Sequence, residues 1–231
     1  MKKNILFILL SSFLSAPAFS QFSVAPRIGV GSTITSSYFV TKIDSLYTRN
    51  RESSQPGITA QIGLELRLQC GKAISVESGI FYQYKSQRTG STIFGIPLDK
   101  ITINNMHYIN MPLEIVFRKA KGGFYGGAGV NFGYGIGGEH KLKYSDDRFT
   151  ESLPVIFDNK AITTDGRTHL DPLTVALCFK LGHSFNSVYL GADFNIGLKN
   201  ISPYQNLSYK TSSIGLHFGY HLNKKSSKKK V

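Results

Sequence analysis

The sequence lacks the features that identify a metal protein or a helical membrane protein. It has only two cysteines, Cys70 and Cys178, and their spacing is not that of a metal site. After residue 21 no segment is apolar over the roughly 20 residues that a membrane-spanning helix needs. Acidic residues are also scarce, at 14 against 27 lysines and arginines, which gives a net charge of +13. These absences argue against a cysteine-ligated metal site and against a helical membrane protein. The positive net charge remains to be explained.

The positive charge does not predict nucleic-acid binding, because no motif combines basic and aromatic residues as nucleic-acid sites do. Two lysines lie near the N-terminus and five lie in the tail after residue 223, and without them the net charge falls from +13 to about +6. A solvated tail, together with loops close to anionic lipid, accounts for the remaining charge.

The first 20 residues have the pattern of a secretory signal peptide. Lys2 and Lys3 precede an apolar run from Ile5 to Leu14, and small residues follow it up to Ser20. The run is only about 10 residues long, too short to cross a membrane as a helix. We therefore predict a cleaved signal peptide over 1–20, a barrel domain over 21–223 and a lysine-rich periplasmic tail over 224–231.

The segment Met106–Ile136 alternates between apolar residues and polar or small ones, which is the period of a β-strand with two unlike faces. One apolar stripe runs through Ile109, Met111, Leu113, Ile115 and Phe117, and a second through Phe124, Gly126, Ala128, Val130, Phe132, Tyr134 and Ile136. The polar break Lys119–Gly123 joins them as a hairpin. Each run has about 11–13 residues, enough to cross a bilayer at a tilt.

Glycines recur on the face opposite the second apolar stripe, at Gly127, Gly129, Gly133 and Gly135. Glycine weakens a strand and offers nothing to pack, so a solvent-exposed face has little reason to use it repeatedly. The lumen of a narrow barrel does have a reason, because side chains there compete for space. The pattern thus predicts that the apolar stripes face lipid and the glycine face lines the lumen.

The same alternation recurs in eight segments. They are Phe22–Val30, Gly57–Cys70, Ala73–Tyr84, Met106–Arg118, Phe124–Ile136, Pro172–Gly182, Val188–Leu198 and Tyr209–Leu222. Long connections (Gly31–Pro56, Lys85–Asn105, Gly137–Asp171, Lys199–Ser208) alternate with short ones. This arrangement predicts an all-β, eight-stranded antiparallel up-and-down transmembrane barrel in the outer membrane of a Gram-negative bacterium, with long loops outside and both termini in the periplasm.

Aromatic residues near the stripe ends are typical of the girdles of such barrels. Phe117, Phe124 and Tyr220 are expected at the periplasmic rim, and Tyr82, Tyr84 and Tyr134 at the outer rim. The two cysteines are predicted on opposite faces, Cys70 outward at a strand end and Cys178 in the lumen, which disfavours a disulfide between them.

Ten inward positions carry titratable side chains and form our predicted lumen charge network: Arg27, Glu65, Arg67, Glu77, Glu114, Arg118, Lys180, Asp193, His217 and His221. A bend at Gly71–Ala73 places Arg67 opposite Glu77 across a hairpin. Because buried charges need partners, we favour a plug of mutually neutralising charges over a proton path, ion path or gated pore.

No cofactor or metal is predicted. His217 and His221 share a face but lie about 13 Å apart along the strand, so one metal ion does not bridge them. The run Gly127–Phe132 lacks the last glycine of the dinucleotide fingerprint and opens no helix.

Tyr108–Arg118, with the sequence YINMPLEIVFR, resembles a strand of the PorT-like family of small outer-membrane barrels, and Pro112 and Leu113 match its pattern. Gly197–Ser202 resembles the stretch after the seventh strand of that family. Asn110 stands where the family usually has an acidic residue, and the lysine tail replaces an aromatic end. The resemblance implies an outer-membrane barrel without a defined role.

Several functions are compatible with this pattern. The favoured hypothesis is a non-enzymatic barrel whose long loops make surface contacts or serve the envelope or a larger machine. A small gated pore, a lipid-modifying enzyme of the outer membrane and a soluble periplasmic ligand-binding barrel are alternatives. Expected partners are outer-membrane lipid, the barrel-assembly machinery during insertion, and a surface or periplasmic protein; no nucleic acid is expected.

Overall fold

The structure is a computed structural model, and it describes residues 22–43, 46–51, 53–71, 73–93, 96–118, 123–144, 150–160, 162, 167–185, 187–204 and 207–222. The predicted signal peptide (1–20) and the lysine-rich tail (224–231) lie outside these residues. In the part of the chain that is described, no helix has the length and apolar character needed to cross a membrane.

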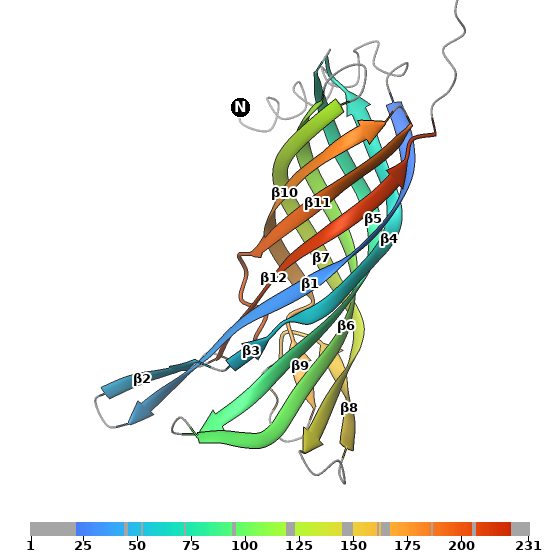
Figure 1. Cartoon of the computed structure of the whole chain (residues 1–231). Coiled ribbons are helices and arrows are strands. Elements are labelled where there is room, and N and C mark those ends of the chain that lie inside the picture. The colour runs from blue at the N-terminus through green and yellow to red at the C-terminus, as the bar shows by residue number, and fades with distance from the viewer. Residues whose placement is uncertain are drawn as a thin grey trace, which may run out of the picture.

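Eight strands form a closed ring (Figure 1). They are β1 (Phe22–Ile43), β4 (Gly57–Gln69), β5 (Ile74–Ile93), β6 (Ile96–Arg118), β7 (Gly123–Tyr144), β10 (Leu173–Phe185), β11 (Val188–Gly197) and β12 (Leu207–Tyr220). Each pairs antiparallel with its neighbours, β12 pairs with β1, and β10 pairs with β7. The predicted eight-stranded antiparallel barrel is confirmed.

Four short strands extend the sheet beyond the ring. β2 (Leu46–Arg51) pairs with the far end of β1, and β3 (Ser53–Gln55) pairs with β5. β8 (Thr150–Phe157) pairs with β7 and, in parallel, with β9 (Thr168–Leu170). In Figure 1 these additions all lie at one end of the barrel, where the long strands project.

The strands β1, β5, β6 and β7 are longer than the sequence pattern predicts, at 22, 20, 23 and 22 residues. At about 3.3 Å per residue each spans roughly 65–75 Å, whereas about 9–11 tilted residues cross a bilayer. The expectation that Gly31–Pro56, Lys85–Asn105 and Gly137–Asp171 are loops is therefore wrong for much of their length. The apolar stripe ends there, but the backbone pairing continues.

The two faces of the barrel wall have the predicted orientation. Outward side chains such as Ile28, Leu113 and Leu216 are 54%, 55% and 62% exposed, while the inward Phe81 and Tyr108 are each 1% exposed. A row of exposed apolar side chains encircling a closed sheet is the surface that hydrocarbon covers in a transmembrane barrel. The alternative with the stripes inward, as in a soluble ligand-binding barrel, is contradicted by this exposure.

Glycines inside the barrel make room for aromatic rings. The Tyr125 hydroxyl lies where a Cβ on Gly182 or Gly191 would be, and the ring of Tyr189 occupies the corresponding space at Gly219. Larger side chains at these positions would displace the rings, since the space is already filled. The glycine face thus serves the packing of the lumen, as predicted for a narrow barrel.

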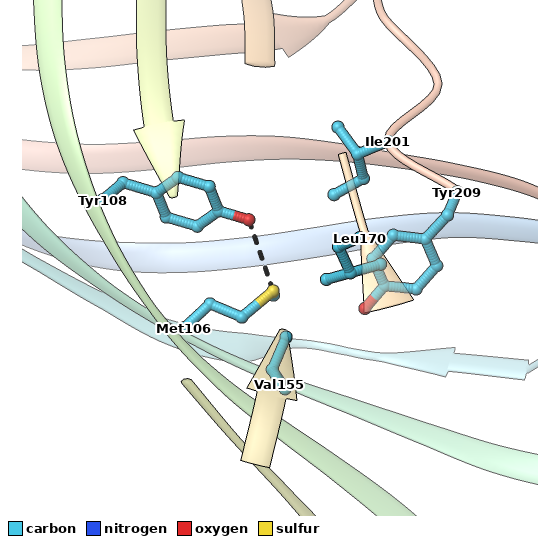
Figure 2. Packing of buried hydrophobic residues seen from close by; sticks show 6 residues of the cluster. All are labelled: Met106, Tyr108, Val155, Leu170, Ile201 and Tyr209. Atoms are coloured by element: carbon cyan, nitrogen blue, oxygen red, sulfur yellow. Dashed lines mark hydrogen bonds between the residues drawn. The ribbon is translucent and has the colours of Figure 1, made fainter. Parts of the chain in front are cut away.

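An apolar cluster closes the end of the barrel from which the strands project (Figure 2). Its buried members are Met106, Tyr108, Val155, Leu170, Ile201 and Tyr209. Val155 and Leu170 come from the paired β8 and β9, so the chain beyond the ring folds back over the opening. Phe157 packs against this cluster, and its ring fills the space beside Gly135. We call this end the mouth and this group the mouth cluster.

Candidate functional site: the charged lumen and its mouth

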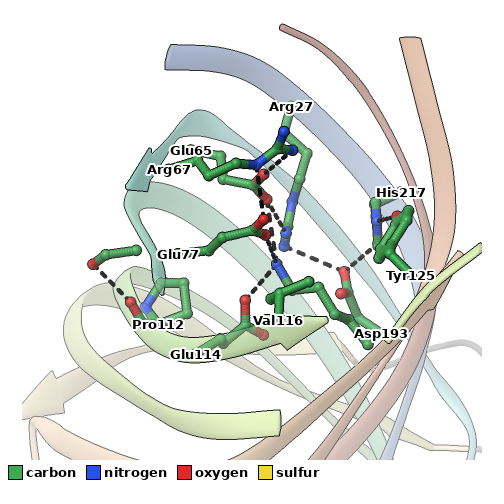
Figure 3. A network of polar contacts seen from close by, with 12 residues as sticks. Arg27, Glu65, Arg67, Glu77, Pro112, Glu114, Val116, Tyr125, Asp193 and His217 are labelled. Carbon is green, nitrogen blue, oxygen red and sulfur yellow. Dashed lines mark hydrogen bonds and ion pairs between the residues drawn. The ribbon is translucent and has the colours of Figure 1, made fainter. Parts of the chain in front are cut away.

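Seven of the eight ring strands contribute residues to the lumen charge network, and one further member follows the last strand. The members are Arg27 on β1, Glu65 and Arg67 on β4, Glu77 on β5, Glu114 and Arg118 on β6, Lys180 on β10, Asp193 on β11, His217 on β12 and His221 just after it. Figure 3 labels seven of these side chains, namely Arg27, Glu65, Arg67, Glu77, Glu114, Asp193 and His217. Nine are buried and Arg67 is half-buried. The structure therefore brings all ten predicted residues into one interior.

Lys180 is the centre of the network. Its Nζ lies 2.5 Å from Glu114 Oε2, 2.9 Å from Glu77 Oε2 and 3.4 Å from Glu65 Oε2. The side chain is 1% exposed. An ammonium buried to this degree is tolerated only when carboxylates surround it, and the three strands β4, β5 and β6 each supply one.

Arg27 links the two sides of the lumen. It donates from Nη1 to Glu65 Oε2 at 3.0 Å and from Nη2 to Asp193 Oδ2 at 3.2 Å. Its guanidinium also lies 4.5 Å from the centroid of the Phe81 ring, a cation–π distance. The arginine therefore joins the carboxylates of β4 and β11, which are far apart in the chain.

A second group lies nearer the short turns. Arg67 pairs across the hairpin with Glu77 in the predicted register, with Nε 2.8 Å from Oε1. Arg118 Nη2 donates to the same carboxylate oxygen at 3.2 Å, and its guanidinium lies 4.1 Å from the Tyr125 ring centroid. Arg67 also contacts His221. Glu77 is thus shared by three cations.

The two histidines sit in different surroundings. His217 Nδ1 lies 2.9 Å from Asp193 Oδ2, and its Nε2 lies 2.7 Å from the Tyr125 hydroxyl. His221 stacks on Tyr189 with 4.6 Å between ring centroids. Within the described residues no three His, Cys, Asp or Glu side chains are grouped so as to hold a metal ion.

The network balances its charge and fills the lumen. It holds four basic side chains besides the histidines and four carboxylates, so its formal charges cancel. Two cavities beside it have volumes of about 10 and 20 Å³, room for about one water molecule each. Ion pairs at these distances, with cavities this small beside them, leave little free space in this part of the lumen.

A layer of amide side chains lies next to the charges, and the sequence reasoning did not treat it as part of the site. Gln61 Nε2 donates to Asp193 Oδ2 at 3.1 Å, and Asn110 Nδ2 donates to Gln83 Oε1 at 2.7 Å. Gln83 in turn donates to Thr59 Oγ1 at 3.2 Å. Their inward positions on the alternating pattern are the sequence signal that points to them.

The mouth contains polar groups that the sequence analysis assigned to loops. His140 Nδ1 lies 2.6 Å from Asn104 Oδ1, and His169 Nδ1 lies 2.8 Å from Asp158 Oδ1. Hydrogen bonding from His169 lowers the pKa of the Asp158 carboxyl below its ordinary value. Nothing in the local sequence around these residues predicts that β7, β8 and β9 bring them together.

The remaining predicted positions lie on the faces expected. Cys70 is exposed and Cys178 is buried, both as free thiols. The rim nearer the mouth includes His107, whose ring stacks on Tyr82 at 5.8 Å between centroids, and the other rim includes His183, which packs edge-on against Phe124 at 5.1 Å. These contacts join the two histidines to the aromatic girdles. β10 continues to Phe185, so the strand expected to end at Gly182 includes His183.

Several solved structures are similar to this chain over most of its length, each at low sequence identity. Among solved structures, the chain is similar to the attachment invasion locus protein Ail of Yersinia pestis bound to the heparin analogue sucrose octasulfate, at 14% identity over 85% of this chain and 99% of that one, with a TM-score of 0.29. Neisserial surface protein A is 7% identical over 85% and 97%, with a TM-score of 0.36. The translocator domain of autotransporter NalP from Neisseria meningitidis is 12% identical over 95% and 94%, with a TM-score of 0.29.

No curated protein matches the chain. The family described as "Outer membrane protein beta-barrel domain" matches residues 18–203, which is most of the 231 residues. This match confirms the predicted class of barrel, whereas the narrower PorT-like assignment stays a prediction. The closed ring, its apolar outer face and this match together place the chain in the outer-membrane β-barrel domain family.

Proposed function

We propose that this protein is a non-enzymatic, non-conducting outer-membrane barrel that presents its projecting strands at the cell surface for contact with other molecules. The observation that carries the proposal is the double closure of the barrel. The lumen charge network fills the interior, and the mouth cluster covers the end from which the strands project. A lumen filled by side chains is what eight strands usually enclose.

The proposed orientation follows from the lengths of the connections. Short turns join β4 to β5, β6 to β7 and β10 to β11, and outer-membrane barrels place such turns in the periplasm. Both termini are then periplasmic, and the long ends of β1, β5, β6 and β7 face outward. Outer-membrane lipid surrounds the barrel, the assembly machinery inserts it, and a surface or periplasmic protein is its proposed partner. Within the family we propose a PorT-like member.

Conductance in planar bilayers tests the closure. We expect no channel current after insertion has been verified, while a porin reconstituted in the same bilayers gives current and validates the recording. Steady or voltage-gated conductance from the purified barrel would favour the pore alternative and overturn the proposal. The filled lumen is the physical reason for the expected silence.

Labelling of cysteines in intact cells tests the orientation. In a Cys70→Ser background, Ser152→Cys places a thiol at an exposed position of β8, and Gly71→Cys places one at an exposed position between β4 and β5. A membrane-impermeant maleimide should label the first variant and not the second until the outer membrane is permeabilised. The opposite labelling pattern would reverse the proposed orientation.

A further inference from the structure

The outward face of the neighbouring strands β5, β6 and β7 changes character where they project beyond the ring (Figure 1). Within the apolar band it carries exposed rings such as Tyr82 and Tyr134. Further along β5 on the same face come Tyr84, which pairs in register with His107, and then the exposed Arg88. This face therefore passes from apolar to aromatic to cationic in one direction along the strands.

The cations of this face come from two strands that flank a third. Arg88 on β5 and Lys141 on β7 both pair in register with Ile103 on β6. Neighbouring strands lie about 4.8 Å apart, so the two backbones are roughly 10 Å from each other and the long side chains can converge over Ile103. Lys143 follows Lys141 on the same face of β7. We call Arg88, Lys141 and Lys143 the cationic patch.

The protein neutralises only part of the charge of the cationic patch. Lys141 Nζ lies 2.8 Å from Glu139 Oε2 at the surface. Arg88 and Lys143 are exposed, and neither forms an ion pair with a carboxylate among the described residues. Glu151 on β8 lies on the opposite face of the sheet. Three cations and one carboxylate leave this face with a net charge of +2.

A row of hydrogen-bonded rings lies between the cationic patch and the apolar band. The Tyr82 hydroxyl lies 2.6 Å from His107 Nδ1, and the Tyr84 hydroxyl donates to Asn105 Oδ1 at 2.9 Å. The His107 ring lies 5.8 Å from the Tyr82 ring and 5.5 Å from the Tyr84 ring, between centroids. Amphipathic rings of this kind lie where lipid headgroups meet the hydrocarbon. The row thus marks the outer limit of the apolar band.

The height of the cationic patch above this row limits the kind of lipid that reaches it. Ile103 lies four residues beyond His107 on β6, which is roughly 13 Å along the strand. At a strand tilt of about 40° this places the patch about 10 Å further from the hydrocarbon. The headgroup layer of a phospholipid bilayer is only about 5–8 Å thick on each side. The patch is therefore level with a taller headgroup, such as one built on sugars.

From its charge, its height and its continuity with the apolar band, we infer that the cationic patch binds the phosphate groups of a phosphorylated glycolipid of the outer leaflet. Guanidinium and ammonium groups both bind phosphate oxygens through charge-assisted hydrogen bonds. The acyl chains of the same molecule lie against the apolar stripe below the aromatic row. A soluble acidic macromolecule would match the charge but would leave that stripe unused. The inference deepens the proposed function and rests on its orientation, which places this face in the outer leaflet.

Binding of diphosphorylated lipid A to the full chain refolded in neutral detergent micelles tests the inference, with bound lipid counted by native mass spectrometry. We expect lipid A to bind at least about tenfold more tightly than phosphatidylcholine, which has no net charge, and than inorganic phosphate, which has no acyl chains. Raising the salt concentration to about 1 M should remove most of the preference for lipid A over phosphatidylcholine, because the patch is exposed and its charge is screened.

The double variant Arg88→Gln, Lys143→Gln removes the two cations that have no carboxylate partner among the described residues. It should weaken lipid A binding by about tenfold or more and leave phosphatidylcholine binding unchanged. Lys210→Gln is the matched control. Lys210 follows the inward-facing Tyr209 on β12, so it also faces outward, but β1 and β4 separate β12 from β5. Its replacement should leave lipid A binding unchanged.

Substitutions at such surface positions usually change stability little, and the folding of each variant is verified by its mobility on an unheated gel. Equal lipid A affinity of the double variant and the parent, an equal loss in Lys210→Gln, or phosphatidylcholine binding as tight as that of lipid A would overturn the inference. Tighter binding of polyglutamate than of lipid A would assign the patch to an acidic protein and would also overturn it.

The two levels of the proposal fail separately. If lipid A is not preferred by a barrel that inserts without conducting and labels in the proposed orientation, only the lipid ligand is refuted and the proposed function stands. If the cysteine labelling shows the reverse orientation, the proposed function falls, and the assignment of this face to the outer leaflet falls with it.

Discussion

Replacing Lys180 by methionine tests how the lumen is held together. The substitution keeps a long side chain but removes the ammonium that lies within 3.4 Å of three carboxylates. Glu77 keeps Arg67 at 2.8 Å and Arg118 at 3.2 Å, and Glu65 keeps Arg27 at 3.0 Å. Glu114, by contrast, loses its ion pair, so one carboxylate remains buried without compensation.

The expected cost of Lys180→Met is about 3–5 kcal/mol in the free energy of unfolding, the usual penalty for breaking a buried ion pair from one side. Adding Glu114→Gln restores the balance of charge, so the double variant should recover about 2 kcal/mol or more relative to Lys180→Met. An exposed pair gives the control: Lys141→Met removes an ion pair of 2.8 Å to Glu139 at the surface and should cost about 0–1 kcal/mol.

Urea unfolding in lipid vesicles measures these differences from the shift in midpoint. Because the chain has no tryptophan, folded and unfolded fractions are best read from gel mobility without heating. A cost below about 1 kcal/mol for Lys180→Met would refute the reasoning, since a buried charge left alone is expected to cost more. A double variant no more stable than Lys180→Met would also refute it, because the cost would then not come from unpaired charge.

Three further predictions concern the wall, the mouth and its pH dependence. Leu113→Lys on the lipid face should lower the free energy of unfolding in vesicles by about 2–4 kcal/mol. Ile34→Lys, which lies beyond the predicted apolar stripe, should lower it by about 0–1 kcal/mol. Equal costs for the two variants would contradict the assigned position of the bilayer. Gly135→Val should displace the Phe157 ring and speed proteolysis of the mouth, and Phe157→Ala should relieve that effect; no change in proteolysis would contradict the packing. The pKa of the Asp158 carboxyl is lowered by its contact with His169, so this contact stabilises the mouth fully above pH 3.8, the ordinary pKa of the group. The stabilisation is lost as the pH falls through the lowered pKa. NMR of the His169 ring should follow this loss, and the Asp158→Asn variant should not show the pH dependence.

Much of the barrel could be predicted from alternation alone, because a lipid face and a crowded lumen impose opposite demands on neighbouring residues. Leu113 and Glu114 show this directly, one 55% exposed to the bilayer and the other 4% exposed inside. The short turn between β4 and β5 sets the register of these strands, and this register places Arg67 opposite Glu77. Both predictions rest on constraints that act within a single hairpin.

The half of the barrel from which the strands project could not be predicted in the same way. Beyond the bilayer the outward residues no longer need to be apolar, so the stripe on β1 ends while Thr33 and Thr35 still occupy inward strand positions. Such β-branched residues favour strands, but that preference is weaker than the lipid pattern. The polar groups of the mouth are further still from local sequence, since Asp158 and His169 come within hydrogen-bond distance only where β8 and β9 pair in parallel.

The unequal strand lengths give the barrel a bevelled rim. β5, β6 and β7 continue well past the point where β10 and β11 stop, so a tall sheet stands over one side of the opening (Figure 1). In the proposed orientation, antibodies approaching from outside would meet the far end of that sheet before they reach the mouth cluster at its foot.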